Sequence, residues 1–182
     1  MTSLHTLAIP PLIRGMLNLT AILKRAETSG ISPASIFASR IHPTMFPFPS
    51  QIFFLTRMAA NIPTDINPSL PMFTVPPFED SPSFDSLIAR IAKTVAYLEG
   101  IKPEDLNGRE GEKVNLRIER KFSGNVAYIE YGAAEYVGMH AHPYFWFHVV
   151  TAYDLLRKEG VELGKIDFLN AAGLHEWVLK VE

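Results

Sequence analysis

Three of the six histidines in the chain lie within nine residues, in the run from His140 through His142 to His148. Four consecutive aromatic side chains, residues 144–147, fill the space between the last two. A buried imidazole needs a hydrogen-bond partner, so few purely structural core segments have this composition. The run therefore indicates an aromatic-lined pocket with polar groups in it, or an unusually polar part of the core.

One face of the helix expected after Pro143 carries the best acid–base candidates. Tyr144, His148 and Thr151 follow one another at i, i+4 and i+7, so they share a face of that helix. A histidine on an inward face can exchange protons near neutral pH, and Tyr144 beside it would donate a hydrogen bond to a carbonyl group. The candidate catalytic residues are thus His148 and Tyr144, with one of three further histidines as partner: His42, His140 and His142.

Two other interpretations of the same run stay open. His148 could be a core histidine whose partner is Asn18 or Gln51 across a bundle. A metal site would need several ligands around one ion, but His148 lies about 12 Å along a helix from His140. Only a break at Pro143 would bring them together. The sequence favours neither a metal nor any other cofactor, and we expect none.

Other polar and aromatic side chains could anchor a ligand. Arg14 and Asn18 stand at i, i+4 in the first expected helix, and an arginine can clamp a carboxylate or a phenolate, although a surface ion pair is the simpler explanation. If some of the aromatic residues line a cavity, its ligand is apolar, and cyclic or polyenic. The remaining candidate ligand contacts are Arg40, Phe46, Gln51, Trp146 and Thr151.

Four amphipathic patterns predict the helices that position these residues. Three- and four-residue spacing of apolar residues predicts helices over residues 10–29, 50–62, 83–99 and 144–158, with Ser50 and Ser83 as N-caps. Arg90 falls outside the apolar stripe of the third helix. Gly30, Gly100 and Gly160 follow three of the helices as stop signals.

Two segments between these helices have other patterns. Residues 63–82 hold six prolines together with large apolar residues, which predicts an extended strap lying across the core. Alternation of apolar and polar residues from 112 to 130, around Gly124 and Asn125, predicts a β-hairpin. Pro143 is expected to separate His140 and His142 from the last helix. The sequence thus predicts a mainly α fold, a four-helix bundle with a small hairpin before the last helix.

Composition excludes several classes of protein. The chain has 182 residues, 47% of them hydrophobic, a net charge of −2 and no cysteine. These values predict a single domain over residues 1–182, with a tail from about residue 170 that the patterns do not place. They argue against a nucleic-acid partner and exclude disulfides and thiol catalysis. No signal peptide or membrane-spanning run is recognised, so we expect a cytoplasmic protein without a membrane partner.

Several motifs resemble the domain-of-unknown-function 1993 (DUF1993) family, over about residues 8–169. The longest match runs from Pro143 to Phe168 and includes His148, Tyr153 and Asp154. Shorter matches lie in the earlier helices and in the loop between the first two: Arg14, Gly15, Asn18, Arg40, Pro43, Phe46, Gln51, Arg90, Lys93 and Thr94.

The resemblance implies a fold of the DinB/YfiT-like superfamily, a four-helix bundle that often forms homodimers, and we expect a homodimer. Relatives in that superfamily bind a divalent metal through three histidines, and some are thiol-dependent isomerases or transferases. His140, His142 and Tyr144 depart from the resembled pattern, whereas His148 belongs to it. The residues together predict a cofactor-independent enzyme that isomerises, dehydrates or cyclises an apolar, oxygenated molecule. A binding protein without activity and a metal-dependent transferase are the alternatives.

Overall fold

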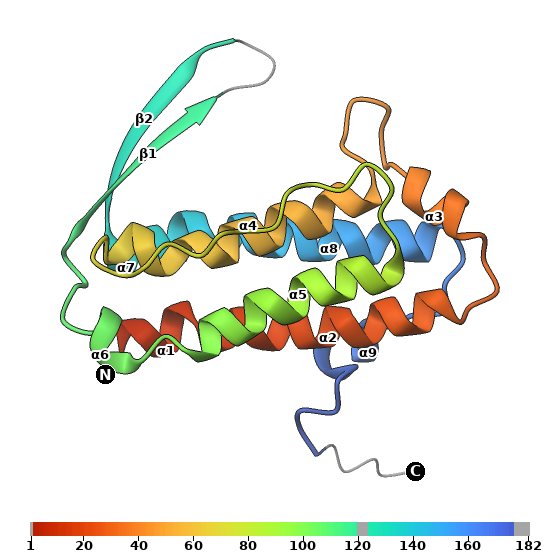
Figure 1. Ribbon diagram of the computed structural model, residues 1–182, viewed down its shortest axis with the longest axis horizontal. Helices are drawn as coiled ribbons and strands as arrows, with labels where there is room; N and C mark the ends of the chain where they lie inside the picture. Colours follow the sequence, from red (N-terminus) through yellow and green to blue (C-terminus); the bar gives the residue numbers. More distant parts are fainter. Residues whose placement is uncertain (1, 120–123, 177–182) are drawn as a thin grey trace.

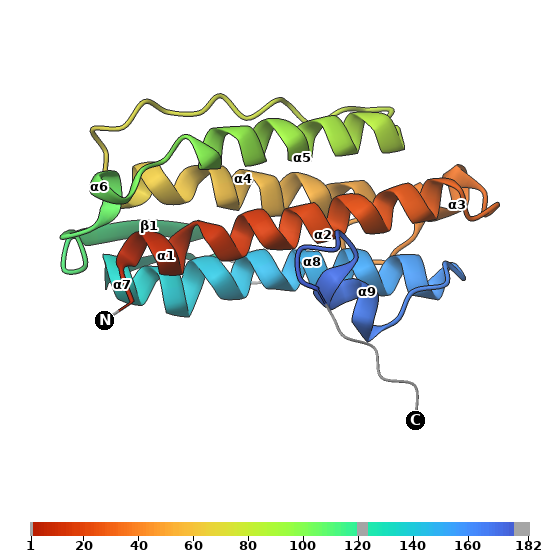
Figure 2. The same cartoon turned by 90° about the horizontal axis from the view of Figure 1, so that it is seen from below.

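The computed structural model describes residues 2–119 and 124–176. Four long helices lie side by side and form the bundle (Figures 1 and 2): α2 (Pro10–Glu27), α4 (Phe48–Ile66), α5 (Phe84–Glu99) and α8 (His142–Lys158). Each contributes an apolar face to one continuous core. The predicted mainly α bundle with a small β-hairpin is confirmed, whereas the expectation of a single domain stays a prediction.

The ends of α5 and α4 differ in how closely they follow the predicted caps. Ser83 caps α5 as predicted, since its hydroxyl accepts from Ser86 N (3.1 Å) while Ser86 Oγ accepts from Ser83 N (3.0 Å). The prediction for α4 was wrong at both ends. The helix begins at Phe48, so Ser50 lies inside it, and it continues through Pro63 to Ile66. Pro63 is buried, and core packing offsets the backbone hydrogen bond that a proline cannot donate.

The prediction that Pro143 breaks the chain was also wrong. A short helix, α7 (Ala133–Tyr136), passes into a π-helical turn, η1 (Val137–Ala141), and then directly into α8. His142 N donates to Val137 O, five residues back, which is the π pattern. Widening the turn moves carbonyl groups away from the proline ring, so Pro143 is accommodated in the first turn of α8.

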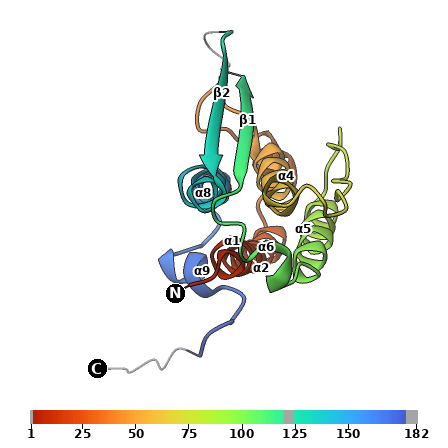
Figure 3. The same cartoon turned by 90° about the vertical axis from the view of Figure 1, so that its left-hand side faces the viewer.

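The strap and the hairpin lie on different sides of the bundle (Figures 1 and 3). Residues 67–82 contain no helix or strand and run along α4 and α5, which confirms most of the predicted strap; residues 63–66 belong to α4. β1 (Lys113–Glu119) and β2 (Val126–Gly132) pair antiparallel, with Leu116 opposite Ile129. The hairpin projects from the end of the bundle, where it contacts α4 and α7.

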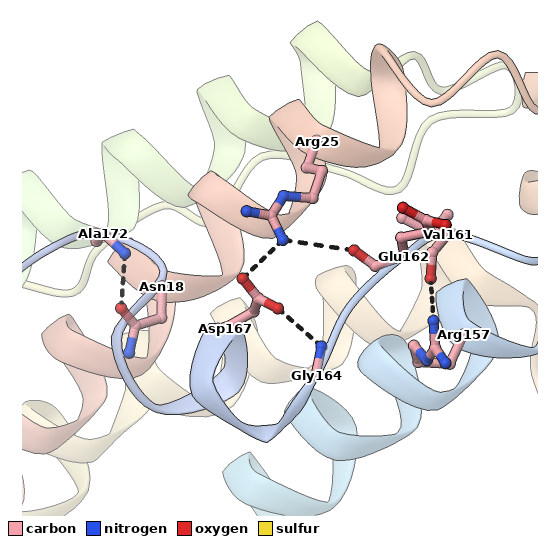
Figure 4. A network of polar contacts seen from close by, with 8 residues as sticks. All are labelled: Asn18, Arg25, Arg157, Val161, Glu162, Gly164, Asp167 and Ala172. Carbon is pink, nitrogen blue, oxygen red and sulfur yellow. Dashed lines mark hydrogen bonds and ion pairs between the residues drawn. The ribbon is translucent and has the colours of Figure 1, made fainter. Parts of the chain in front are cut away.

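Four short helices complete the described chain: α1 (Leu4–Ala8), α3 (Pro33–Ala38), α6 (Pro103–Leu106) and α9 (Lys165–Asn170). Polar contacts hold α9 and the segment after it against α2 (Figure 4). Arg25 forms an ion pair with Asp167 (2.6 Å), and Asn18 Oδ1 accepts from Ala172 N (3.1 Å). The chain after α8 is thus placed as far as residue 176; Trp177 lies outside the described residues.

The stretch Leu4–Glu27, which comprises α1 and α2, is long and apolar enough to cross a membrane by length and composition alone. The expectation that no run approaches this length was therefore wrong. Half of the most apolar 18-residue window in this stretch is buried inside the bundle. Its apolar residues are accounted for by bundle packing.

Candidate functional site

Four side chains with ionisable groups form one ladder along α7, η1 and α8: Tyr136, His140, Tyr144 and His148. Successive ring centroids lie 5.9, 6.2 and 4.7 Å apart. In a regular α-helix each four-residue step would drift by about 40° around the axis. The wider π turn offsets part of this drift, so the four rings stay on the side that faces α4. We call them the ladder.

His148 is a neutral imidazole in a fixed orientation. Gln51 Nε2 donates to Phe46 O (2.9 Å), so Gln51 Oε1 is the acceptor for His148 Nδ1, at 2.7 Å. The proton therefore lies on Nδ1, and the lone pair on Nε2 is available. The side chain is only 8% exposed, and burial lowers the pKa of His148 to about 4. Of the two predicted cross-bundle partners, Gln51 is confirmed and Asn18 is wrong.

A carboxylate, that of Asp65, lies beside the opposite end of the ladder. Tyr136 Oη donates to Asp65 Oδ2 at 2.5 Å, and burial raises the pKa values of both groups. His140 lies over Tyr136. Burial lowers the pKa of His140, while the charge of Asp65 opposes that shift. Asp65 and Tyr136 were not among the predicted site residues, although Tyr136 continues the four-residue spacing of the ladder.

Aromatic rings surround His148 and remain partly open to solvent. Phe54 lies 5.1 Å from it and 5.1 Å from Phe46, and Phe147 lies 5.0 Å away, between ring centroids. Phe46 and Phe147 are 47% and 56% exposed. An apolar molecule could therefore stack beside the imidazole without displacing the core. The ladder, Gln51 and these rings form the candidate site.

The other predicted residues lie elsewhere. Trp146 Nε1 donates to His142 Nδ1 (3.2 Å), and both lie on the side of α8 away from His148. Arg14 and Asn18 donate to Leu169 O (3.2 and 3.0 Å), so they hold α9 against α2. Three further hydrogen bonds stay local: Arg40 Nη1 to Met45 O (2.7 Å), His42 Nδ1 with Thr44 Oγ1 (2.9 Å), and Thr151 Oγ1 to Phe147 O (2.7 Å).

The donor set does not fit the three-histidine metal site implied by the superfamily. Within residues 2–119 and 124–176, no three histidine, aspartate or glutamate side chains lie close enough together to hold one ion. The neighbours of His148 are the amide of Gln51 and aromatic rings, which do not make up the usual ligand set of a catalytic transition metal.

A cavity of about 470 Å³, widely open to solvent, lies away from the ladder, between α2 and the end of α5. Apolar side chains line most of it, including Ile13, Leu17 and Leu98, and Arg14 is at its edge. His175, near the end of the described chain, contributes to its wall. This volume is within the range of small-molecule pockets.

The fold and the site define a DinB-like helical bundle with an aromatic, histidine-containing face. The family model "Domain of unknown function (DUF1993)" matches residues 4–169, and the chain belongs to this family. The crystal structure of a DinB family member protein from Shewanella denitrificans is similar over 98% of this chain and 96% of that one, with 25% identity and a TM-score of 0.72. No curated protein matches the sequence.

Proposed function

We propose that the protein is a cofactor-independent enzyme that carries out acid–base chemistry on an apolar, oxygenated small molecule. The observation that carries this proposal is the Gln51–His148 hydrogen bond within a ring of aromatic side chains. It holds a neutral imidazole with Nε2 free, next to the phenol of Tyr144. Isomerisation, dehydration and cyclisation need only positioning and proton transfer, which this arrangement supplies.

The low pKa of His148 determines which proton it can accept. A base whose conjugate acid has a pKa of about 4 removes a proton near pH 7 only where a neighbouring group makes that proton acidic. A substrate carbonyl that accepts a hydrogen bond from Tyr144 would do so for a proton on the adjacent carbon. Nε2 would take this proton and return it to another atom of the same molecule, so the isomerisation balances without a cofactor.

Deletion of the gene and metabolite analysis of the source organism would identify the substrate as a compound that accumulates. The purified protein should convert this compound in the presence of a metal chelator and without an added cofactor. His148→Ala should lower kcat by roughly 10²- to 10⁴-fold with binding retained. Tyr144→Phe should lower kcat as well, whereas the matched change Tyr128→Phe, on a phenol that is 78% exposed on the hairpin, should not.

Three outcomes would contradict the proposal. Unchanged turnover by His148→Ala would remove the role of His148. Equal losses in Tyr144→Phe and Tyr128→Phe would remove that of Tyr144. Loss of conversion upon chelation would instead favour the metal-dependent transferase.

The 470 Å³ cavity favours a second candidate, a binding protein without activity. Arg14, a predicted ligand anchor, is at the edge of this cavity and is half-buried. If this candidate holds, the accumulated compound binds without being converted, and Arg14→Gln weakens binding while His148→Ala does not. Arg109→Gln, outside both sites, is the matched control.

A homodimer is also part of the proposal. The exposed positions of η1 and α8 from residue 138 to 150 carry no charged side chain: Gly138, Met139, Pro143, Phe147 and Val150. An apolar stripe on one helix is typical of an interface. A second copy seated there would cover the rings beside His148 and exclude water from the site. We further propose a cytoplasmic location, which rests on the lack of cysteine.

A further inference from the structure

The strap covers α4 and α5 with few ties to them (Figures 1 and 2). Within the described chain, one hydrogen bond joins residues 71–82 to the helices, from Arg90 Nη1 to Pro77 O (3.0 Å). Two ring contacts add to it, Phe73 with Tyr97 (4.7 Å) and Phe78 with Phe53 (5.5 Å). Few contacts would therefore have to break for residues 71–82 to move away from the helices.

Arg90 is buried beneath the strap without a full set of partners. The prediction that it lies outside the apolar stripe missed this, because the strap covers it and leaves it 6% exposed. Its Nε donates to Thr56 Oγ1 (2.9 Å), and its guanidinium lies 4.6 Å from the centre of the Phe53 ring. Its Nη2 is buried with no hydrogen-bond partner. Glu79 of the strap lines the same crevice, and its charge opposes the lowering of the Arg90 pKa by burial, but the two side chains do not form an ion pair. A buried guanidinium without a paired carboxylate is costly.

Tyr97 is in a similar position two turns along α5. Its hydroxyl is buried without a partner, and burial raises the pKa of the phenol. In the described part of the chain, Arg90 Nη2 and Tyr97 Oη are the buried side-chain polar atoms that lack a partner. Seven residues separate them, so they lie on one face of α5, about 10 Å apart along its axis. The strap thus covers two hydrogen-bond donors that it does not satisfy.

We propose that the strap is the lid of a second ligand site, which binds an elongated, apolar carboxylic acid with an oxygen at its far end. The carboxylate pairs with Arg90, the distal oxygen accepts from Tyr97, and the rings of Phe53 and Phe73 flank the apolar chain. The crevice beside Arg90 has a volume of about 10 Å³, room for roughly one water molecule, so the strap must open to admit the ligand. This site is separate from the ladder and does not depend on its function.

Calorimetric titration with decanoate, its terminally hydroxylated analogue and decanol tests the proposal. The wild-type protein should bind the two acids with one-to-one stoichiometry, and decanol at least about tenfold more weakly because it cannot pair with Arg90. The hydroxylated acid should bind about 2- to 10-fold more tightly than decanoate, since Tyr97 can donate to it.

Substitutions test which residue causes each of these ligand preferences. Arg90→Gln should abolish the preference for decanoate over decanol. Tyr97→Phe, which removes one oxygen and preserves the ring, should abolish the preference for the hydroxylated acid. Lys93→Gln, on the exposed side of α5, should change neither. Phe78→Ser should tighten binding about 3- to 10-fold, because the open strap becomes more populated.

Several results would overturn the proposal. One is the absence of binding by both the wild-type protein and Phe78→Ser. Another is a set of NMR shift changes that map to the cavity beside Arg14 and not to residues 67–82 and α5. If Tyr97→Phe still prefers the hydroxylated acid over decanoate, Tyr97 does not contact the ligand as proposed. This result would overturn the proposal even if Arg90→Gln fails to fold. Unchanged affinity in Phe78→Ser would remove the lid.

Discussion

The protonation of His148 links the candidate site to stability. Burial holds its pKa at about 4 in the folded protein, whereas an unfolded histidine titrates near 6.5. As the pH falls from 6.5 to 4, His148 binds a proton in the unfolded chain but not in the folded protein, so the free energy of unfolding decreases. Above pH 6.5 the contribution of His148 to this free energy is constant. Between pH 7 and 4.5 the wild-type protein should lose about 2–3 kcal/mol more than His148→Gln.

Urea unfolding of the two proteins at both pH values measures this difference. An imidazole signal of His148 that titrates near pH 6.5 in the folded protein would contradict it.

Asp65 should control the titration of His140. Its negative charge raises the pKa of His140 against the effect of burial, so Asp65→Asn should lower that pKa further. An NMR titration of the His140 ring measures the shift. Asp154→Asn removes an exposed carboxylate from the far part of α8 and should leave the titration unchanged. A pKa of His140 that rises in Asp65→Asn would show that the two groups do not interact as described.

Residue-scale prediction from sequence succeeded where one helix sufficed. Between elements it found Gln51 as a partner of His148 but missed other contacts. The face shared by Tyr144 and His148 follows from spacing alone. Asp65 reaches the site from α4, beyond a proline that was expected to end that helix. Arg14 and Asn18 contact α9, which no sequence pattern placed.

At the scale of elements, Gly15 sets how closely α2 approaches α8. A Cβ atom on Gly15 would lie 2.8 Å from Trp146 Cη2 and 2.9 Å from Phe145 Cε1. Gly15→Ala should therefore lower the free energy of unfolding by about 1–3 kcal/mol, although alanine is the better helix former. Gly138→Ala is the matched control, because no atom lies within 4 Å of the added Cβ there, and it should be neutral or stabilising. Thermal unfolding of both variants decides; equal melting temperatures would contradict the close approach.

The elements themselves were largely predictable because each carries its own periodicity and caps. Local signals were sufficient to predict three features: the Ser83 cap of α5, the hairpin from its alternation, and the end of α8 from Gly160, whose φ is +99°. Pro63 and Pro143 led to wrong predictions of breaks in the helices. A buried helix or a π turn can accommodate a proline when tertiary contacts compensate for the lost backbone hydrogen bond. Similarly, the helix pattern placed Arg90 outside, but a strap without periodicity covers it.

At the scale of the whole molecule, the apolar stripe on η1 and α8 should mediate self-association. Met139→Lys, on a side chain that is 71% exposed, should shift the protein from dimer to monomer, because it places a charge in the interface. Ile166→Lys introduces the same charge at an exposed apolar residue of α9 and should not. Sedimentation velocity distinguishes the species. A monomeric wild-type protein, or a Met139→Lys variant that remains dimeric, would remove this interface.

The π turn fixes the direction in which the hairpin leaves the bundle. It holds one more residue than an α-helical turn of equal length, so it absorbs one residue without rotating the segment before it. Loss of a single codon within residues 137–141 would restore an α-helical turn and leave α7 and the hairpin on the same side of the bundle. Loss of a codon from the regular part of α8 would instead rotate everything before it by about 100° around the helix axis. The gene can thus lose a codon at the π turn while the protruding arm keeps its direction.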